Sequence, residues 1–392
     1  MNIAYILHST TPTAGATKSF IVMLQGLMKM GVKPVVVVPD REGIYEGLKK
    51  MGIPVLAKTY RMYTYPRGNT LSRKFLFLPR LLARLVTNRI ATKATTDFLQ
   101  KYPIDIVHTN VGPVNIGFRA ARKLGKPHIF HLREYGKLDF GYYYFPNVSH
   151  FYRQLDNAPH SYSICITRGI QRFHHQDGKT SSRVIYNDIC SQIQEMPVQN
   201  EGHNDYFLYA GRLEPAKGID TLLEAYLLYS LHTPQSLPLF IAGRATNNVF
   251  MGRLHHFVAK HNLQQLVSFL GERNDMTDLM RNARAIIIPS LHEAFGRCLP
   301  EAMLQGCLTI GRNTDGTKEQ YDNGLELTGE EIGLRYDTNE ELARLLREVT
   351  LNPTSHYQPY KDRAFYTVNK LYTQEKNIQQ IYSFYKDILK GT

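Results

Sequence analysis

Two carboxylates in the second half of the sequence have the types and spacing of a binding site for a polyhydroxylated ligand. Glu293 and Glu301 enclose seven residues, which include Phe295, Gly296 and Pro300. A carboxylate on a loop can accept hydrogen bonds from sugar hydroxyls, and one at the start of a helix can hold the two hydroxyls of a ribose. Two solvated glutamates beside a turn would show the same spacing. The surrounding elements therefore have to decide between these interpretations.

The residues around this pair predict a strand, a loop and a helix. Residues 285–288 form a short apolar run that is typical of a buried strand. Pro300 is placed as a first-turn helical proline, with Glu301 in the same turn and Gly306 after the helix. Glu293 is therefore expected on the loop that follows a strand. In open α/β sheets, ligands bind at that edge.

A second strand–loop–helix unit has the residues of a phosphate site. Gly211 and Gly218 enclose Arg212 and Lys217, and a helix is expected from Ile219. Two cations at a helix N-terminus suit a pyrophosphate, because backbone amides and the helix dipole add to their charge. By composition alone, a solvated basic loop would explain the same residues.

Gly15 and His131 take corresponding places in the first half of the chain. Gly15 lies where the loop 8–17 meets a helix expected over 16–30, and a glycine there lets backbone amides approach a phosphate or a sugar. His131 ends a strand expected over 128–131, where an imidazole can hydrogen-bond a hydroxyl or a pyrophosphate. By spacing alone, a structural histidine is the commoner explanation of such a position.

Taken in order, these segments resemble the retaining glycosyltransferases of family 4. Residues 289–307, PSLHEAFGRCLPEAMLQGC, are similar to that family's signature of two glutamates separated by seven residues. The resemblance also includes the segments 209–218, 241–243 and 267–271. It covers residues 205–340 densely and the first 190 residues thinly.

The resemblance implies the GT-B fold and gives each of these residues a role. Glu293 would hold the hydroxyls of the donor sugar, and Glu301 would hold the ribose. Arg212 and Lys217 would bind the diphosphate, and His131 would orient the sugar. The catalytic group is therefore expected to comprise Glu293, His131, Arg212 and Lys217. The donor site is expected to comprise Gly15, Arg212, Lys217, Gly243, Gly271, Glu293, Phe295, Gly296 and Glu301.

The reaction implied by the resemblance moves a sugar from a UDP- or GDP-sugar to an acceptor with retention of the anomeric configuration. The motif places no carboxylate as a covalent nucleophile, and in similar enzymes the leaving phosphate helps to deprotonate the acceptor. The chain contains no Asp-x-Asp segment, which usually marks metal binding in the other nucleotide-sugar transferase fold. The cations of Arg212 and Lys217 can replace a metal ion. We therefore expect no metal and no cofactor.

The sequence predicts an α/β protein with two Rossmann-like doubly wound parallel-sheet domains, which the resemblance places on either side of a cleft. Short β-branched runs alternate with longer amphipathic stretches, as such sheets require. An acceptor-binding domain is expected over 1–190, a linker over 191–204 and a nucleotide-sugar-binding domain over 205–370. A terminal helix over 371–392 is expected to cross back to the first domain. Strands of the first domain are expected at residues 3–7, 34–38, 104–108, 128–131, 162–166 and 183–186.

The bulk composition is that of a globular protein. Its 392 residues, 43% of them hydrophobic, suffice for two domains. No apolar run approaches the ~20 residues that span a bilayer, and the apolar run 3–7 is too short for a signal peptide. The four cysteines are scattered, which indicates buried thiols in a reducing compartment rather than a zinc site or a disulfide framework. We therefore expect a cytoplasmic protein.

Residues 58–96 contribute strongly to the net charge of +13, with nine basic residues and no acidic one. Leu78, Leu81, Leu82 and Leu85 within this segment are spaced as one face of a helix. Two interpretations are open. The helix can lie on an anionic membrane surface, or its leucines can face the protein core while the basic face is solvated. No nucleic-acid-binding module is recognisable, so we expect no nucleic acid partner.

These features favour a retaining glycosyltransferase that transfers a hexose-type sugar to a saccharide acceptor. The basic segment favours a lipid-linked acceptor at the inner face of a membrane, as in capsule or lipopolysaccharide assembly. One alternative is another GT-B enzyme, such as a nucleotide-sugar epimerase or an α-glucan phosphorylase; the phosphorylase would need a lysine for pyridoxal phosphate that no segment suggests. A second alternative is a different class of protein, a membrane-associated scaffold with a degenerate nucleotide-sugar site. Such a scaffold would have no physical reason to keep the charged side chains of Arg212, Lys217, Glu293 and Glu301. The sequence leaves the identities of the sugar, the nucleotide and the acceptor open.

Overall fold

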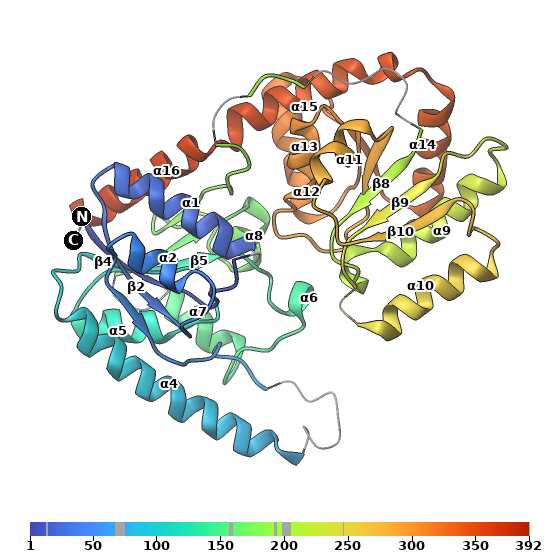
Figure 1. The fold of residues 1–392 in the computed structure, drawn as a ribbon. Helices are drawn as coiled ribbons and strands as arrows, with labels where there is room; N and C mark the ends of the chain where they lie inside the picture. Colours follow the sequence, from blue (N-terminus) through green and yellow to red (C-terminus); the bar gives the residue numbers. More distant parts are fainter. Residues whose placement is uncertain are drawn as a thin grey trace. The chain divides into compact units, whose positions relative to one another are not determined.

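The chain divides into two compact units, each containing one parallel sheet with helices on both faces (Figure 1). One unit comprises Met1–Asp188 and Gln374–Thr392, and the other comprises Ile189–Thr373. Most of the linker expected over 191–204 lies outside the described residues. The computed structural model describes residues 1–12, 15–66, 75–156, 160–191, 194–197, 205–245 and 247–391.

The sheet of the first unit has seven strands in the order β3-β2-β1-β4-β5-β6-β7. The six strands expected there are present, with ends shifted by at most two residues, and the short β3 was not predicted. The order reverses between β1 and β4, which makes their carboxyl ends the switch point of the sheet. The strands are β1 (Asn2–Ile6), β2 (Lys33–Val38), β3 (Val55–Ala57), β4 (Ile106–Thr109), β5 (His128–Leu132), β6 (Ser161–Cys165) and β7 (Ser182–Val184).

Both faces of this sheet are buried at its central strands, and β1 and β2 are accordingly largely apolar. Successive side chains point to opposite faces, so Ile3 and Tyr5 belong to one core and Ala4 and Ile6 to the other. The covering helices are α1 (Gly15–Lys29), α2 (Tyr45–Lys50), α4 (Phe77–Leu99), α5 (Ile116–Leu124), α6 (Lys137–Phe140), α7 (Val148–Asp156), α8 (Arg168–Phe173) and α16 (Gln374–Lys390).

The C-terminal helix α16 packs on α1 in the first unit (Figure 1). The two helices approach closely at Gly26, where a Cβ atom would lie 2.0 Å from Cδ1 of Ile378. Ile381 and Phe384 of α16 join the same core as Ile3 of β1. The helix begins at Gln374, three residues later than the sequence suggested, because α15 of the second unit ends only at Leu371.

Helix α4 does not use its leucine face as a core face. Its buried residues all lie in its C-terminal half, from Asn88 to Leu99. In the N-terminal half, Leu78 and Leu82 are 65% and 61% exposed. The core-facing interpretation is therefore wrong for Leu78 and Leu82, whereas Leu81 and Leu85 are half-buried.

The sheet of the second unit has six strands in the order β10-β9-β8-β11-β12-β13, with its switch point between β8 and β11. Its strands are β8 (Phe207–Ala210), β9 (Leu239–Ala242), β10 (Val267–Gly271), β11 (Ala285–Ile288), β12 (Thr309–Arg312) and β13 (Leu334–Tyr336). Its helices are η1 (Pro215–Lys217), α9 (Ile219–Leu231), α10 (Asn248–Lys260), α11 (Met276–Asn282), α12 (Cys298–Leu304), α13 (Asp315–Thr328), α14 (Asn339–Leu351), η2 (Thr354–Tyr357) and α15 (Gln358–Leu371).

Candidate functional site

The loops after β8 and β11 meet at the switch point of the second sheet. The β8 loop closes in a short 3₁₀ turn, η1, and Gly218 then begins α9 with φ of 68°. A Cβ atom on Gly218 would lie 1.9 Å from the carbonyl oxygen of Pro289, so no other residue fits this approach. The N–H of Leu291 donates to the carbonyl of Ala216 at 3.0 Å. The two loops therefore form one fixed backbone surface.

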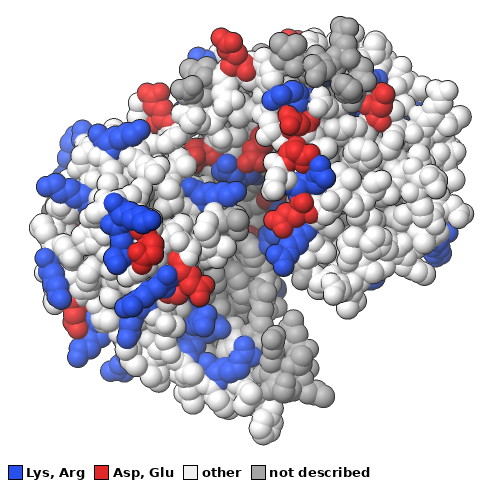
Figure 2. Space-filling view, in the orientation of Figure 1, with Lys and Arg blue, Asp and Glu red and all other residues white. Residues whose placement is uncertain are grey.

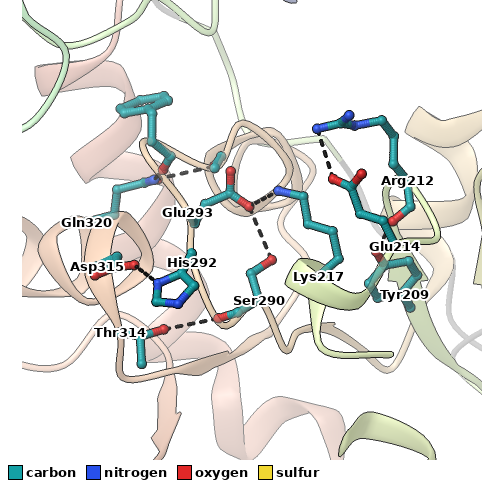
Figure 3. A network of polar contacts seen from close by, with 12 residues as sticks. Tyr209, Arg212, Glu214, Lys217, Ser290, His292, Glu293, Thr314, Asp315 and Gln320 are labelled. Carbon is teal, nitrogen blue, oxygen red and sulfur yellow. Dashed lines mark hydrogen bonds and ion pairs between the residues drawn. The ribbon is translucent and has the colours of Figure 1, made fainter. Parts of the chain in front are cut away.

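Lys217 and Glu293 form an ion pair across these loops (Figure 3). Nζ of Lys217 lies 2.5 Å from Oε2 of Glu293, and the side chains are 18% and 17% exposed. The hydroxyl of Ser290 donates to the same oxygen at 3.1 Å. In the described part of the chain, Oε1 of Glu293 has no hydrogen bond. The carboxylate is thus held by one oxygen and presents the other.

The loop that carries Glu293 is fixed by Gln320, which is buried in α13 (Figure 3). Its amide nitrogen donates to the carbonyl oxygens of Phe295 and Gly296, the latter at 3.3 Å. The N–H of Gly316 donates to the carbonyl of Glu293 at 2.9 Å. Gly296 has φ of 79°, and its Cβ would lie 2.7 Å from Cγ of Glu293. These contacts set the position of the Glu293 side chain.

The Phe295 side chain anchors the loop rather than lining a binding surface. It is 2% exposed, and its ring meets the ring of Tyr372 edge-on with centroids 5.5 Å apart. Only its backbone is therefore available at the site.

Arg212 and Glu301 lie on the same edge and have other partners. Arg212 is paired with Glu214 at 3.0 Å, and its carbonyl accepts the hydroxyl of Tyr209 at 2.9 Å (Figure 3). Glu301, in α12, is paired with Arg297 at 3.0 Å. Arg212, Lys217, Glu293 and Glu301 are thus each paired with a group of opposite charge.

Three glycines bring the ends of β8, β9 and β10 together. The N–H of Gly243 donates to the carbonyl of Gly271 at 2.7 Å, and the N–H of Gly211 donates to that of Ala242 at 3.0 Å. A Cβ atom on Gly243 would lie 1.7 Å from the carbonyl oxygen of Gly211. The edge here is bare backbone, which can approach a ligand closely.

The structure places His131 and Gly15 in the first unit. His131 is the penultimate residue of β5 and is buried, with Nδ1 3.1 Å from Nε2 of His108 and 3.3 Å from Nη2 of Arg133. Burial, followed by the charge of Arg133, lowers the pKa of His131 well below its usual range, so its imidazole is neutral at pH 7. Its Nε2 is buried with no partner among the described residues.

Gly15 is the first residue of α1. Its φ is not positive, and no atom lies within 4 Å of the position of a Cβ. Neither backbone conformation nor space therefore requires a glycine here.

Several residues of this edge were not singled out by the sequence. Ser290 and Gln320 hold the Glu293 loop, and Nδ1 of His292 lies 3.1 Å from the carboxylate of Asp315 (Figure 3). Thr314 donates to the carbonyl of Ser290 at 3.0 Å, which links the loops after β11 and β12. The partners of Gln320, His292 and Thr314 are more than twenty residues away in the sequence, so no local spacing reveals these contacts.

Among the described residues, no group of three or more His, Cys, Asp or Glu side chains is arranged to hold a metal ion. In the same ranges, no helix combines the length and apolar character that crossing a membrane requires.

The two-unit architecture is that of GT-B glycosyltransferases. The crystal structure of HepE from Anabaena in complex with UDP superimposes with a TM-score of 0.74, and the match covers 99% of this chain and 100% of that one. A glycosyltransferase from Rickettsia africae gives a TM-score of 0.75 and covers 100% and 99%. The sequence identities are 19% and 18%, so these likenesses show the fold.

The sequence comparisons assign the second unit more narrowly. Residues 192–367, less than half of the chain, match the model of the family Glycosyl transferases group 1. The chain therefore carries a group 1 glycosyltransferase domain. An uncharacterized glycosyltransferase of Methanocaldococcus jannaschii is 24% identical over 67% of this chain and 72% of its own length. The O-antigen chain mannosyltransferase B of Escherichia coli is 32% identical over 31% of this chain, a match that spans about a third of that relative.

Proposed function

We propose that this protein is a retaining hexosyltransferase of family 4 that takes a UDP- or GDP-sugar as its donor. The observation that carries the proposal is the Lys217–Glu293 pair at the switch point of the second sheet. A nucleotide sugar presents hydroxyls and a diphosphate side by side. A carboxylate and an ammonium group 2.5 Å apart match these two groups, one each.

The positions of the loops suggest which residues bind the diphosphate of the donor and which bind its sugar. Lys217 precedes the N-terminus of α9, so the helix dipole and free amides add to its attraction for a diphosphate. Arg212 joins it from the same loop. Glu293 holds sugar hydroxyls through the oxygen that Lys217 and Ser290 do not occupy.

The remaining donor contacts are proposed along the same edge. Glu301 holds the ribose hydroxyls. The bare backbone at Gly243 and Gly271 lies against the nucleotide, and the amides of Phe295 and Gly296 face the sugar.

The transfer step needs no covalent intermediate. The bond between the anomeric carbon and the diphosphate oxygen breaks, and the acceptor hydroxyl oxygen bonds to that carbon on the same face. The hydroxyl proton passes to the departing diphosphate. The nucleoside diphosphate gains negative charge as it leaves, so Arg212 and Lys217 stabilise the transition state. These cations take the place of a metal ion, and we propose that the reaction is metal-independent.

In the first unit, His131 would orient the donor sugar. Its buried Nε2 has no partner among the described residues, and its ring is neutral at pH 7. A neutral imidazole can exchange hydrogen bonds with a hydroxyl without repelling Arg212 or Lys217.

We further propose that the acceptor is a lipid-linked saccharide in surface polysaccharide assembly at the inner face of a membrane. The O-antigen mannosyltransferase among the relatives supports the polysaccharide class. Support for the membrane comes from α4, where Leu78, Leu82, Val86 and Ile90 recur every fourth residue and are exposed. The exposed Arg89 and Lys93 suit an anionic lipid surface.

Donor binding tests the proposal most directly. We would screen UDP- and GDP-sugars by thermal shift with the wild type, Lys217→Ala and Glu301→Ala. The matched control is Arg344→Ala, which removes an exposed cation paired with Glu348. At about 100 times its dissociation constant, a donor stabilises the fold by about 2.7 kcal/mol. We expect one donor to stabilise the wild type and the control, and both site variants much less. Equal stabilisation of all four proteins would place the donor elsewhere.

Turnover then separates a transferase from an epimerase or a scaffold. Release of free nucleotide should require an acceptor, and NMR of the product should show the anomeric configuration of the donor. Activity abolished by a chelator and restored by magnesium would contradict metal independence.

A further inference from the structure

A polar cavity lies at the carboxyl edge of the first sheet, entirely within the first unit. It has a volume of about 440 Å³, within the range of small-molecule sites. Residues after β1 and β2, the segment 60–65 and helix α4 provide most of its walls. The lining residues are His8, Ser9, Pro39, Asp40, Tyr60, Arg61, Met62, Thr64, Tyr65, Arg80, Arg84, Val114 and Tyr142.

The charges of this cavity are unbalanced. Arg61, Arg80 and Arg84 line it, together with one carboxylate, Asp40. Burial, and then the neighbouring charges of Arg80 and Arg61, lower the pKa of Arg84, as expected where two further guanidinium groups line the same cavity. No ion pair among the described residues includes Arg61 or Arg84. Figure 2 shows basic side chains along the region of α4.

Asp40 is already engaged at the edge of the cavity. Its Oδ1 accepts the hydroxyl of Thr10 at 2.5 Å and the N–H of Glu42 at 3.1 Å. These hydrogen bonds hold the carboxylate in place, and its single negative charge is outnumbered by the three arginines.

The wall that carries the arginines is held rigidly. Asn88 of α4 exchanges two hydrogen bonds with the backbone of Arg61, at 2.8 and 2.9 Å. Arg84 donates to the carbonyl of Thr64 and, at 3.0 Å, to its hydroxyl. The buried hydroxyl of Tyr60 donates to the carbonyls that end β1 and β2. A rigid wall loses little entropy when a ligand binds.

His8 adds a neutral polar group to the same cavity. Burial, and then the charge of Arg133, lower its pKa to about 4, so it carries no charge at pH 7. Its Nδ1 is buried with no partner among the described residues. A neutral imidazole beside the arginine cluster can hydrogen-bond a hydroxyl of the same ligand.

We propose that this cavity binds a phosphate or diphosphate group of the acceptor through Arg61, Arg80 and Arg84, with a sugar hydroxyl at His8. The proposal rests on the proposed function and specifies the class of acceptor. Guanidinium groups bind phosphate oxygens in pairs, and an anion among them removes their mutual repulsion. A phosphate of this kind can come from a lipid-linked saccharide diphosphate or from a free sugar phosphate.

The first test measures the binding of inorganic pyrophosphate by calorimetry at low salt. Saturating UDP blocks the proposed donor site, and the Lys217→Ala variant replaces this block if UDP does not bind. The variants are Arg61→Gln and Arg84→Gln, with Arg344→Gln as the exposed control. Arg61 contacts Asn88 through its backbone, so its substitution leaves the wall intact.

We expect both site variants to bind pyrophosphate at least tenfold more weakly, and the control to bind it as the wild type does. Absent binding to the wild type, or equal binding to all four proteins, would overturn the proposal. Because the donor site is blocked or disabled throughout, a failure here is independent of the fate of the donor proposal.

The second test identifies the source of the phosphate. Under the same conditions, we would compare a saccharide joined by diphosphate to a short alkyl chain, a sugar 1-phosphate, and a neutral glycoside of the same sugar. Tighter binding of the alkyl diphosphate indicates a lipid-linked acceptor, and equal binding of the two phosphorylated ligands indicates a free one. Binding of the neutral glycoside as tightly as either would contradict the proposal.

Discussion

Both sheets of this chain have a switch point at their carboxyl edge, but the charged side chains near these edges differ. Those in the second unit are ion-paired, whereas arginines outnumber carboxylates in the first. In the second unit, Lys217 is paired with Glu293 and Arg212 with Glu214. In the first unit, Arg61, Arg80 and Arg84 line one cavity with a single carboxylate. A paired edge suits a ligand with both hydroxyl and anionic groups, because each partner can exchange its neighbour for a ligand group. An unbalanced edge suits an anion alone.

One carboxylate in each unit, Glu293 and Glu134, also differs in its surroundings. Glu293 is held by a cation in the second unit. In the first unit, Glu134 is buried beside Tyr142, and it accepts the N–H of Gly112 at 3.1 Å. Burial, and then the charge of Asp139, raise the pKa of Glu134 to about 8. One carboxylate is therefore paired with a cation, and the other is a mainly neutral part of the core.

The largest effect is expected on turnover at the paired edge. Lys217→Ala removes a preorganised cation from the departing diphosphate, and we expect kcat to fall by about 10²–10³. Glu293→Gln keeps the shape but loses the charge, and should reduce activity comparably. Steady-state kinetics with Arg344→Ala as control measures both. A rise in KM with kcat unchanged would show that Lys217 contributes equally to binding of the ground state and of the transition state.

The next effect concerns the bare backbone of that edge. Gly243→Ala would place a Cβ 1.7 Å from the carbonyl oxygen of Gly211, so we expect a loss of about 3 kcal/mol in the free energy of unfolding. The matched control is Gly252→Ala in α10, where no atom lies within 4 Å of the new Cβ. That change should stabilise the protein by up to about 1 kcal/mol. Urea unfolding of both variants gives the comparison, and equal midpoints would show that the edge adapts.

A third effect tests the neutral carboxylate of the first unit. The folded state keeps the Glu134 proton up to about pH 8, whereas the unfolded chain releases it near pH 4.5. The folded state thus binds the extra proton in this interval, and the contribution of Glu134 to stability falls as the pH rises. Glu134→Gln removes this loss and should stabilise the protein by on the order of 2 kcal/mol at pH 8, but little at pH 4.5.

Urea midpoints of wild type and variant across this range measure the effect. Buried histidines such as His8 and His108 have lowered pKa values, so their contribution to stability changes with pH in the opposite direction. This contribution is the same in both proteins and cancels in the difference between their midpoints. A difference that does not change with pH would show that Glu134 is ionised in the folded state.

The strands with long apolar runs could be predicted from the sequence, and those without could not. Residues 34–38 and 285–288 are uninterrupted runs buried on both faces, and their strands lie where expected. Strands β12 and β13 were not predicted, because Gly311 and Arg335 interrupt four- and three-residue strands. Their burial comes from neighbours in the sheet, which no local pattern shows.

The same distinction applies to the functional groups. Glu293, Glu301, Arg212 and Lys217 lie close to one another in the sequence or beside clear strand ends, and the resemblance of these segments to a family motif nominated them. Gln320 acts on a loop about 25 residues earlier, and the three arginines of the first unit converge only because α4 packs beside the segment 60–65. The face that α4 presents was also ambiguous, since Leu78 has the spacing of a core residue and is exposed.

The smallest expected effect is a change in the free energy of unfolding that has opposite signs at the two edges. Removing one member of a paired site destabilises the other member, whereas removing one of several like charges relieves repulsion. Arg61→Gln should therefore raise the free energy of unfolding by about 0.5 kcal/mol at low salt, and Lys217→Ala should lower it. At 1 M salt, where the screening length is about 3 Å, the gain from Arg61→Gln should disappear.

Urea unfolding at the two salt concentrations measures this difference, and pyrophosphate provides the internal control. If the arginines of the first unit repel one another, pyrophosphate should stabilise the wild type more than Arg61→Gln. The order of stability of the two proteins should then reverse as the ligand is added. A loss of stability in Arg61→Gln without ligand would mean that a neighbouring group already balances the charge of Arg61. The charged side chains of both edges would then be paired.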